Sequence, residues 1–201
     1  MNILFTIAQE GGDLKNKFRN ILLSIWVFLD PLYYPFTRLQ HLTADPEKGG
    51  VFRVRLTKYK GNDIQLSDGV IIRKNDLLLK IHLHNVRLLK DFNYMKNELL
   101  KGRAIYKRVK ESMPLLTAFI LSHPEETKIK GVIGITLINK GFSTLGFECI
   151  SPKNKLYCWF KKTFQLPIYF LSCSKISAAN LKKHRTVYLL MSKENLINKY
   201  K

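Results

Sequence analysis

Two histidines, His82 and His84, stand two residues apart in the segment NDLLLKIHLHN, residues 75–85. If this segment is a strand, both side chains share one face with Lys80, while the intervening apolar residues face the other way. Such a pair of imidazoles could move a proton, ligate a metal ion or orient a phosphoryl group. A metal ion needs further ligands that the spacing does not select, and Lys80 would repel it. We therefore predict no metal site and favour an anionic ligand; the alternative is half-buried polar residues bonded to loop carbonyls.

Two arginines alternate with apolar residues in the segment VFRVRLTKY, residues 51–59. Arg53 and Arg55 would share one face of a strand, and Arg can grip a carboxylate or phosphate with two parallel hydrogen bonds. If this face joins that of Lys80, four or five donors converge, and Asn85 could help to orient the ligand. The alternative is a solvated face of a half-exposed antiparallel strand.

A catalytic variant of this hypothesis adds Glu148, a carboxylate inside the apolar segment LGFECI. Glu148 could act as a general acid or base with His82 or His84, which makes these three the candidate catalytic residues. The chain has no GxSxG motif and no glycine-rich phosphate loop. The sequence therefore names no cofactor and leaves open whether the protein is an enzyme.

An aromatic segment, LDPLYYPFTRL at residues 29–39, supplies two further candidate binding residues. Tyr33 could stack on a sugar ring, and Arg38 could contact an anion. The alternative is a rigid corner with half-buried rings.

The chain carries an unusually large excess of positive charge. Its 201 residues contain 34 Lys and Arg against 15 Asp and Glu, for a net charge of +19. Such an excess indicates an anionic partner: a phosphorylated small molecule, an acidic lipid or a nucleic acid. Nucleic acid is supported by bulk charge alone, since no zinc finger or RNP-like motif is present.

The N-terminal region bears on where the protein resides. The spacing predicts an amphipathic helix over about residues 13–29, which either packs on the protein's own core or lies on an acidic membrane. Its apolar run, residues 21–29, is shorter than the roughly 20 residues that span a bilayer. Three cysteines without CxxC spacing suit a reducing compartment. We expect a cytoplasmic protein, with the inner face of the membrane as a further possibility.

Hydrophobic periodicity and turn-forming residues predict the strands and helices that position these side chains. Residues 51–84 predict three or four antiparallel strands, with a hairpin at Asp68-Gly69. Residues 86–122 predict two helices broken near Gly102, and strands and a final helix capped by Ser192 follow. The expected fold is α+β: a single domain, residues 1–201, with an antiparallel sheet flanked by helices.

Several phrases in this order resemble the YkoP-like family, a bacterial domain found alone or fused to polysaccharide deacetylases. The phrases are LDPLYYPFTRL, VFRVRLTKYKG, LSDGVIIRKNDLLLKIHLHN, LGFE and LLMSKENLINKY. The resemblance implies an anionic cell-envelope precursor as ligand, or a non-catalytic role as the partner of an envelope enzyme. The histidine and aspartate motifs of the deacetylase are not present here.

Overall fold

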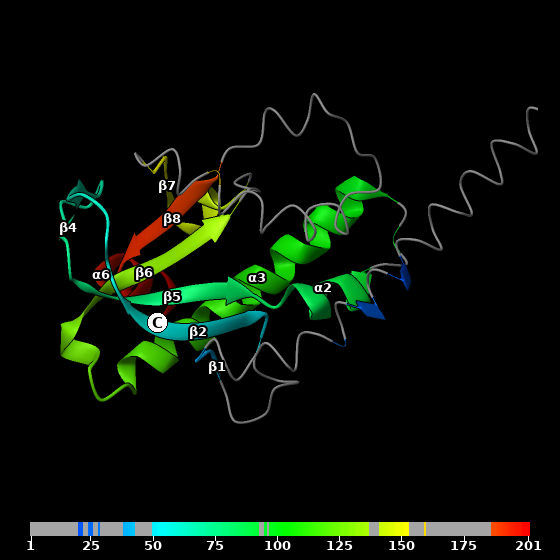
Figure 1. Cartoon of the computed structure of the whole chain (residues 1–201), viewed down its shortest axis with the longest axis horizontal. Coiled ribbons are helices and arrows are strands. Elements are labelled where there is room, and N and C mark those ends of the chain that lie inside the picture. Colours follow the sequence, from blue (N-terminus) through cyan, green and yellow to red (C-terminus); the bar gives the residue numbers. More distant parts are fainter. Residues whose placement is uncertain are drawn as a thin grey trace, which may run out of the picture. The chain divides into compact units, whose positions relative to one another are not determined.

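A computed structural model describes residues 20–21, 24–25, 28, 38–42, 50–92, 95, 97–136, 141–152, 159 and 186–201. The chain divides into two compact units, Met1–Arg38 and Leu39–Lys201. All described strands lie in the second unit, which carries the α+β fold (Figure 1). The predicted fold class is confirmed, and the extent of the domain over residues 1–201 stays a prediction.

The main sheet of the described residues has six strands in the order β1-β2-β5-β6-β8-β7. Their bounds are β1 (Gln40–His41), β2 (Phe52–Lys58), β5 (Leu77–Leu83), β6 (Ile129–Thr136), β7 (Glu148–Ile150) and β8 (Val187–Ser192). Strands β5 and β6 pair in parallel, whereas the other neighbours are antiparallel. The sheet is therefore mixed, because the chain returns from the end of β5 to the start of β6 through a helical crossover.

That crossover contains two helices, α2 (Asn85–Phe92) and α3 (Glu98–Leu121). Helix α3 begins at a cap in which Asn97 Oδ1 accepts hydrogen bonds from the backbone N–H groups of Leu99 (2.9 Å) and Leu100 (3.2 Å). The predicted break near Gly102 is wrong, because α3 continues through Gly102 and on through Pro114. One glycine costs a helix only about 1 kcal/mol, which the packing of its apolar face outweighs.

The remaining elements are shorter. They are helix α6 (Lys193–Tyr200), the 3₁₀ turns η1 (Glu126–Lys128) and η2 (Ser143–Leu145), and a two-stranded sheet of β3 (Ile64–Gln65) and β4 (Ile71–Ile72). The predicted hairpin at Asp68-Gly69 joins β3 to β4, with Gly69 at φ +86°. The predicted cap of α6 is also confirmed, since Ser192 Oγ accepts a hydrogen bond from the backbone N–H of Asn195 at 2.9 Å.

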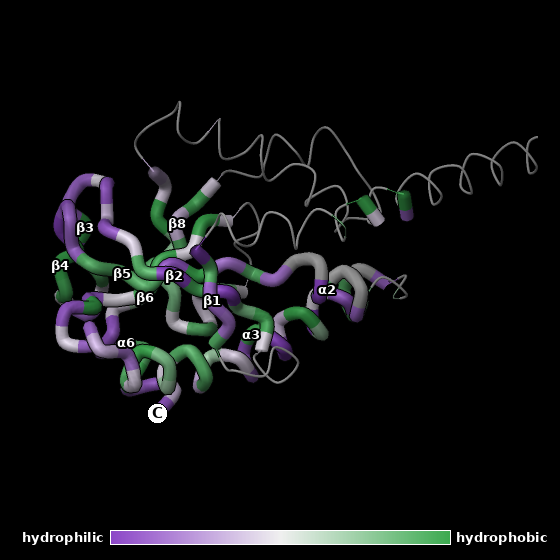
Figure 2. Tube along the Cα trace, turned by 60° about the horizontal axis from the view of Figure 1, so that its bottom comes forward, coloured by the Kyte–Doolittle hydropathy of each residue, from purple (hydrophilic) through white to green (hydrophobic). Residues whose placement is uncertain are grey.

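Helices α3 and α6 cover one face of the main sheet (Figure 1). The core there joins alternate residues of the strands to the inward side of both helices. Its members include Val54, Leu79, Ile81, Val132, Leu189 and Met191 from the sheet and Met113, Leu116, Ile120 and Leu196 from the helices. Hydrophilic residues alternate with these apolar positions along β2 (Figure 2), so Arg53 and Arg55 are directed to the opposite face.

That opposite face has an apolar part of its own. Leu78, Ile133 and Leu190 pack there against a second group from the segment around β3 and β4, namely Tyr59, Leu66 and Ile72. The hairpin therefore covers the part of this face that lies toward β8. The arginines of β2 lie on the far side of β5, past Leu78 and Lys80.

Candidate functional site

The positive side chains of β2 and β5 meet on one face of the sheet. In the antiparallel register Arg53 is opposite His82, and Arg55 is opposite Lys80. Directly paired residues point to the same side of a sheet, with Cβ atoms about 5 Å apart. The two strand faces that the sequence left separate are thus a single surface.

Two more histidines join this surface beside Arg53. Arg53 Nη2 lies 2.7 Å from His84 Nε2, and His41, opposite Arg53 on β1, has its ring centroid 6.0 Å from that of His84. We define the basic sheet face as His41, Arg53, Arg55, Lys80, His82 and His84. His41 was missed by sequence reasoning, because a two-residue strand leaves no alternation to recognise.

The position of His84 follows from the end of β5. Its backbone N–H donates to Val51 O at 2.8 Å, which extends the ladder between β2 and β5 by one residue. Its carbonyl accepts the N–H of Leu88 at 3.1 Å, the first turn of α2. His84 is therefore fixed on both sides at the junction of strand and helix.

The basic sheet face is partly shielded from water. All six of its side chains are half-buried, and the Nε atoms of Arg53 and Arg55 and Nε2 of His82 are buried completely. Charged donors in such surroundings interact with an anion more strongly than the same donors in bulk water. The geometry is suited to holding a phosphate or carboxylate group.

Glu148 lies on the same face of the sheet but far from the histidines. The row Lys80, Ile133, Leu190, Glu148 crosses from β5 to β7. Three strand spacings of about 4.8 Å separate its ends by roughly 14 Å. The structure therefore does not bring Glu148 to His82 or His84.

Glu148 instead anchors the hairpin. Its Oε1 accepts hydrogen bonds from the backbone N–H of Ser67 at 2.7 Å and from Ser67 Oγ at 2.8 Å. On the other side of the hairpin Ser192 Oγ donates to Asp68 Oδ2. These bonds tie the segment between β3 and β4 to β7 and to the start of α6.

The described residues do not test the roles predicted for Tyr33, Arg38 and Asn85. Tyr33 lies outside the described residues. Arg38 is exposed, with φ 53°, at the end of the first unit. Asn85 is described only as the first residue of α2. Their proposed roles stay predictions.

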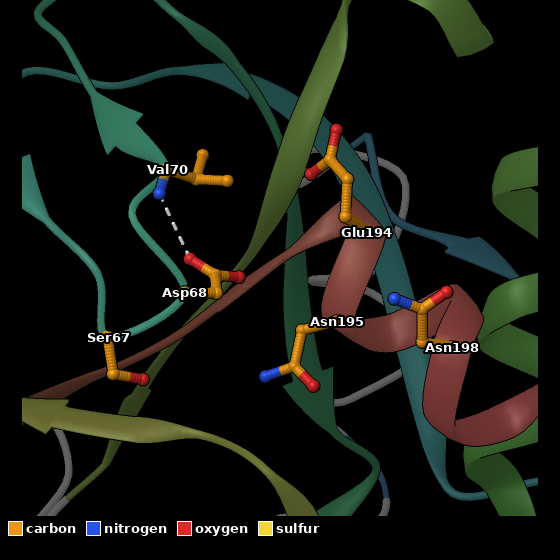
Figure 3. A pocket seen from close by; sticks show the side chains of 6 residues that line it. All are labelled: Ser67, Asp68, Val70, Glu194, Asn195 and Asn198. Atoms are coloured by element: carbon orange, nitrogen blue, oxygen red, sulfur yellow. Dashed lines mark hydrogen bonds between the residues drawn. The ribbon is translucent and has the colours of Figure 1, made fainter.

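Among the surface pockets formed by described residues, two are well defined, and neither is lined by a residue of the basic sheet face. The larger, about 390 Å³, is lined by Ser67, Asp68, Val70, Glu194, Asn195 and Asn198 (Figure 3). The smaller, about 260 Å³, lies between α2, α3 and the turn at Gly50, and places Arg87 and Arg108 beside Asp91 and Glu111. Carboxylates line both pockets, so the excess positive charge of β2 and β5 gathers elsewhere.

Three further findings concern the described residues. No group of three or more His, Cys, Asp or Glu among them is arranged to hold a metal ion. Partial burial of its sulfur raises the pKa of the Cys149 thiol above the ordinary value, which disfavours the thiolate. No helix in this part of the chain is both long and apolar enough to cross a bilayer.

Comparison with known proteins confirms the predicted resemblance. The family model described as the YkoP domain matches residues 19–200. The chain is 46% identical over 182 residues to the uncharacterized protein YkoP of Bacillus subtilis strain 168, covering 90% of this chain and 97% of that protein. No solved structure matches.

Proposed function

We propose that this chain, which belongs to the YkoP-domain family, binds a phosphate-bearing cell-envelope precursor on its basic sheet face. The phosphate could belong to a phosphorylated sugar or to an acidic lipid headgroup. The observation that carries the proposal is the register of β2 and β5, which pairs Arg53 with His82 and Arg55 with Lys80. We propose the cytoplasm, including the inner side of the membrane, as the place where this ligand is met.

Electrostatics supports an anion at this position. Arg55 and Lys80 lie opposite each other on β2 and β5. A phosphate between them would contact both cations, and the planar guanidinium can bind two of its oxygens at once.

The histidines would orient the ligand. His82 lies opposite Arg53, and His84 is in direct contact with its guanidinium, so both imidazoles border the same anion position. Since Glu148 is out of their reach, we propose binding as the role of this face and assign no proton transfer to the Glu148–histidine pair.

The test is thermal unfolding of the purified protein with glucose 1-phosphate and, in a separate arm, glycerol 3-phosphate as a soluble headgroup. A ligand of the native state raises the unfolding free energy by RT ln(1 + [L]/Kd), about 2.7 kcal/mol at 100 Kd. We expect the rise of the midpoint to disappear in a His82→Ala/His84→Ala variant. His123→Ala is the matched control, because His123 lies in the turn after α3, where its Nδ1 accepts a hydrogen bond from the N–H of Glu125.

Other outcomes would redirect the assignment. Absence of a shift with either phosphate ester, and with nucleotide sugars, would contradict the proposal and leave a protein partner as the next hypothesis. Binding that falls log-linearly with salt for any DNA or RNA sequence would indicate a nucleic-acid-binding protein instead.

A further inference from the structure

An apolar stripe lies on the described part of the N-terminal helix. Ile21, Ile25 and Phe28 are helical, and 57%, 49% and 71% of their surfaces are exposed. At about 100° per residue these three positions fall within an arc of roughly 60°, so they form one stripe along the helix. Large apolar side chains that gather on one side of an exposed helix usually have a partner.

Charge indicates what that partner is. Lys15, Lys17 and Arg19 directly precede the stripe, and no Asp or Glu occurs between residues 14 and 29. The whole chain carries +19. A second copy of this chain would bring the same cations against one another, which opposes association through this helix.

We propose that this stripe docks onto the surface of an acidic lipid bilayer. Ile21, Ile25 and Phe28 enter the boundary between headgroups and acyl chains, and the preceding lysines and arginine attract the anionic headgroups. The exposed neighbours Asn20 and Ser24 are uncharged, so neither carries a charge toward the acyl region. The docking is independent of the ligand proposed for the basic sheet face, because it uses only residues of the first unit.

The experiment is co-sedimentation of the full-length protein with vesicles. We expect binding to vesicles that contain phosphatidylglycerol and weak binding to vesicles of phosphatidylcholine alone, with the difference reduced by salt. Replacing Ile25 and Phe28 together by serine should weaken binding to the acidic vesicles about tenfold or more, since two large side chains no longer leave water. Leu99→Ser/Leu100→Ser is the matched control, because these leucines of α3 are similarly exposed (65% and 53%) and should leave binding unchanged.

Three results would overturn the inference: no preference for acidic vesicles, equal loss in the control variant, or full binding by the Ile25→Ser/Phe28→Ser variant. Loss of vesicle binding only on changing Arg53 and Arg55 to glutamine would assign the membrane contact to the basic sheet face instead. Concentration-dependent dimers that the serine variant abolishes, without vesicle binding, would make a second copy the partner. Soluble glycerol 3-phosphate keeps the two proposals separate, because the serine variant should still bind it.

Discussion

The guanidinium of Arg53 donates a hydrogen bond to Nε2 of His84 across 2.7 Å. Arg has only donors, so this nitrogen must offer its lone pair, and the imidazole is neutral with its proton on Nδ1. Protonation of His84 at Nε2 would end the hydrogen bond and place a second positive charge beside Arg53. The contact therefore holds the imidazole of His84 in one orientation beside Arg53.

Alkaline pH should destabilise the fold through Tyr59. Burial, assisted by the negative charge of Asp63, raises the pKa of Tyr59 above its ordinary value of 10.0. The unfolded chain therefore loses this proton first, so the stabilisation is complete below about pH 10 and is lost as pH rises toward the higher folded value. Urea midpoints measured between about pH 9 and 11 should fall less steeply for Tyr59→Phe than for the native protein. An unchanged slope would mean that Tyr59 ionises as easily in the folded chain as in the unfolded one.

Gly131 in β6 should tolerate no side chain. A Cβ there would lie 2.3 Å from the carbonyl oxygen of Met191 on β8, a backbone atom that cannot move aside without disturbing the ladder. Gly131→Ala should lower the free energy of unfolding by about 1–3 kcal/mol. Gly102→Ala is the control: no atom lies within 4 Å of its Cβ position, and alanine should stabilise α3 by about 0.5–1 kcal/mol. Chemical denaturation measures both, and equal effects would refute the close approach.

Ser192 should be a stability residue at the junction of β8 and α6. It accepts the N–H of Asn195 and donates to Asp68, and its surface is fully buried. Ser192→Ala should cost about 1–2 kcal/mol of unfolding free energy, because it removes the cap of α6 and the hydrogen bond to Asp68. Ser122→Ala, at the exposed end of α3, should change it by less than about 0.5 kcal/mol.

Local patterns predicted much of this fold, whereas relations between distant segments did not follow from them. The alternation in β2 and β5 correctly separates the arginines and histidines from Val54 and Ile81, because a half-buried strand has one face in the core. The parallel pairing of β5 with β6 depends on how a long helical crossover packs, and no residue in either strand encodes it.

The candidate site was predicted in the same partial way. The alternation within each strand predicts a basic face for that strand. Only the register between β2 and β5 shows that Arg53 lies opposite His82 and Arg55 opposite Lys80. The strand order places Glu148 far from the histidines, because β6 and β8 lie between β5 and β7. His41 enters through a two-residue strand whose pairing with β2 is tertiary in origin.

The most direct test of the basic sheet face is titration calorimetry of glucose 1-phosphate and glycerol 3-phosphate into three proteins: native, Arg53→Gln/Arg55→Gln, and Arg73→Gln/Lys74→Gln. Arg73 and Lys74 are exposed beyond β4, so the control removes the same two charges away from the site. Loss of two charged hydrogen-bond donors should weaken binding at least tenfold in the first variant, and the control should bind like the native protein. Equal weakening in both variants would show that net charge alone attracts the phosphate, and no binding by the native protein would contradict the proposed function itself.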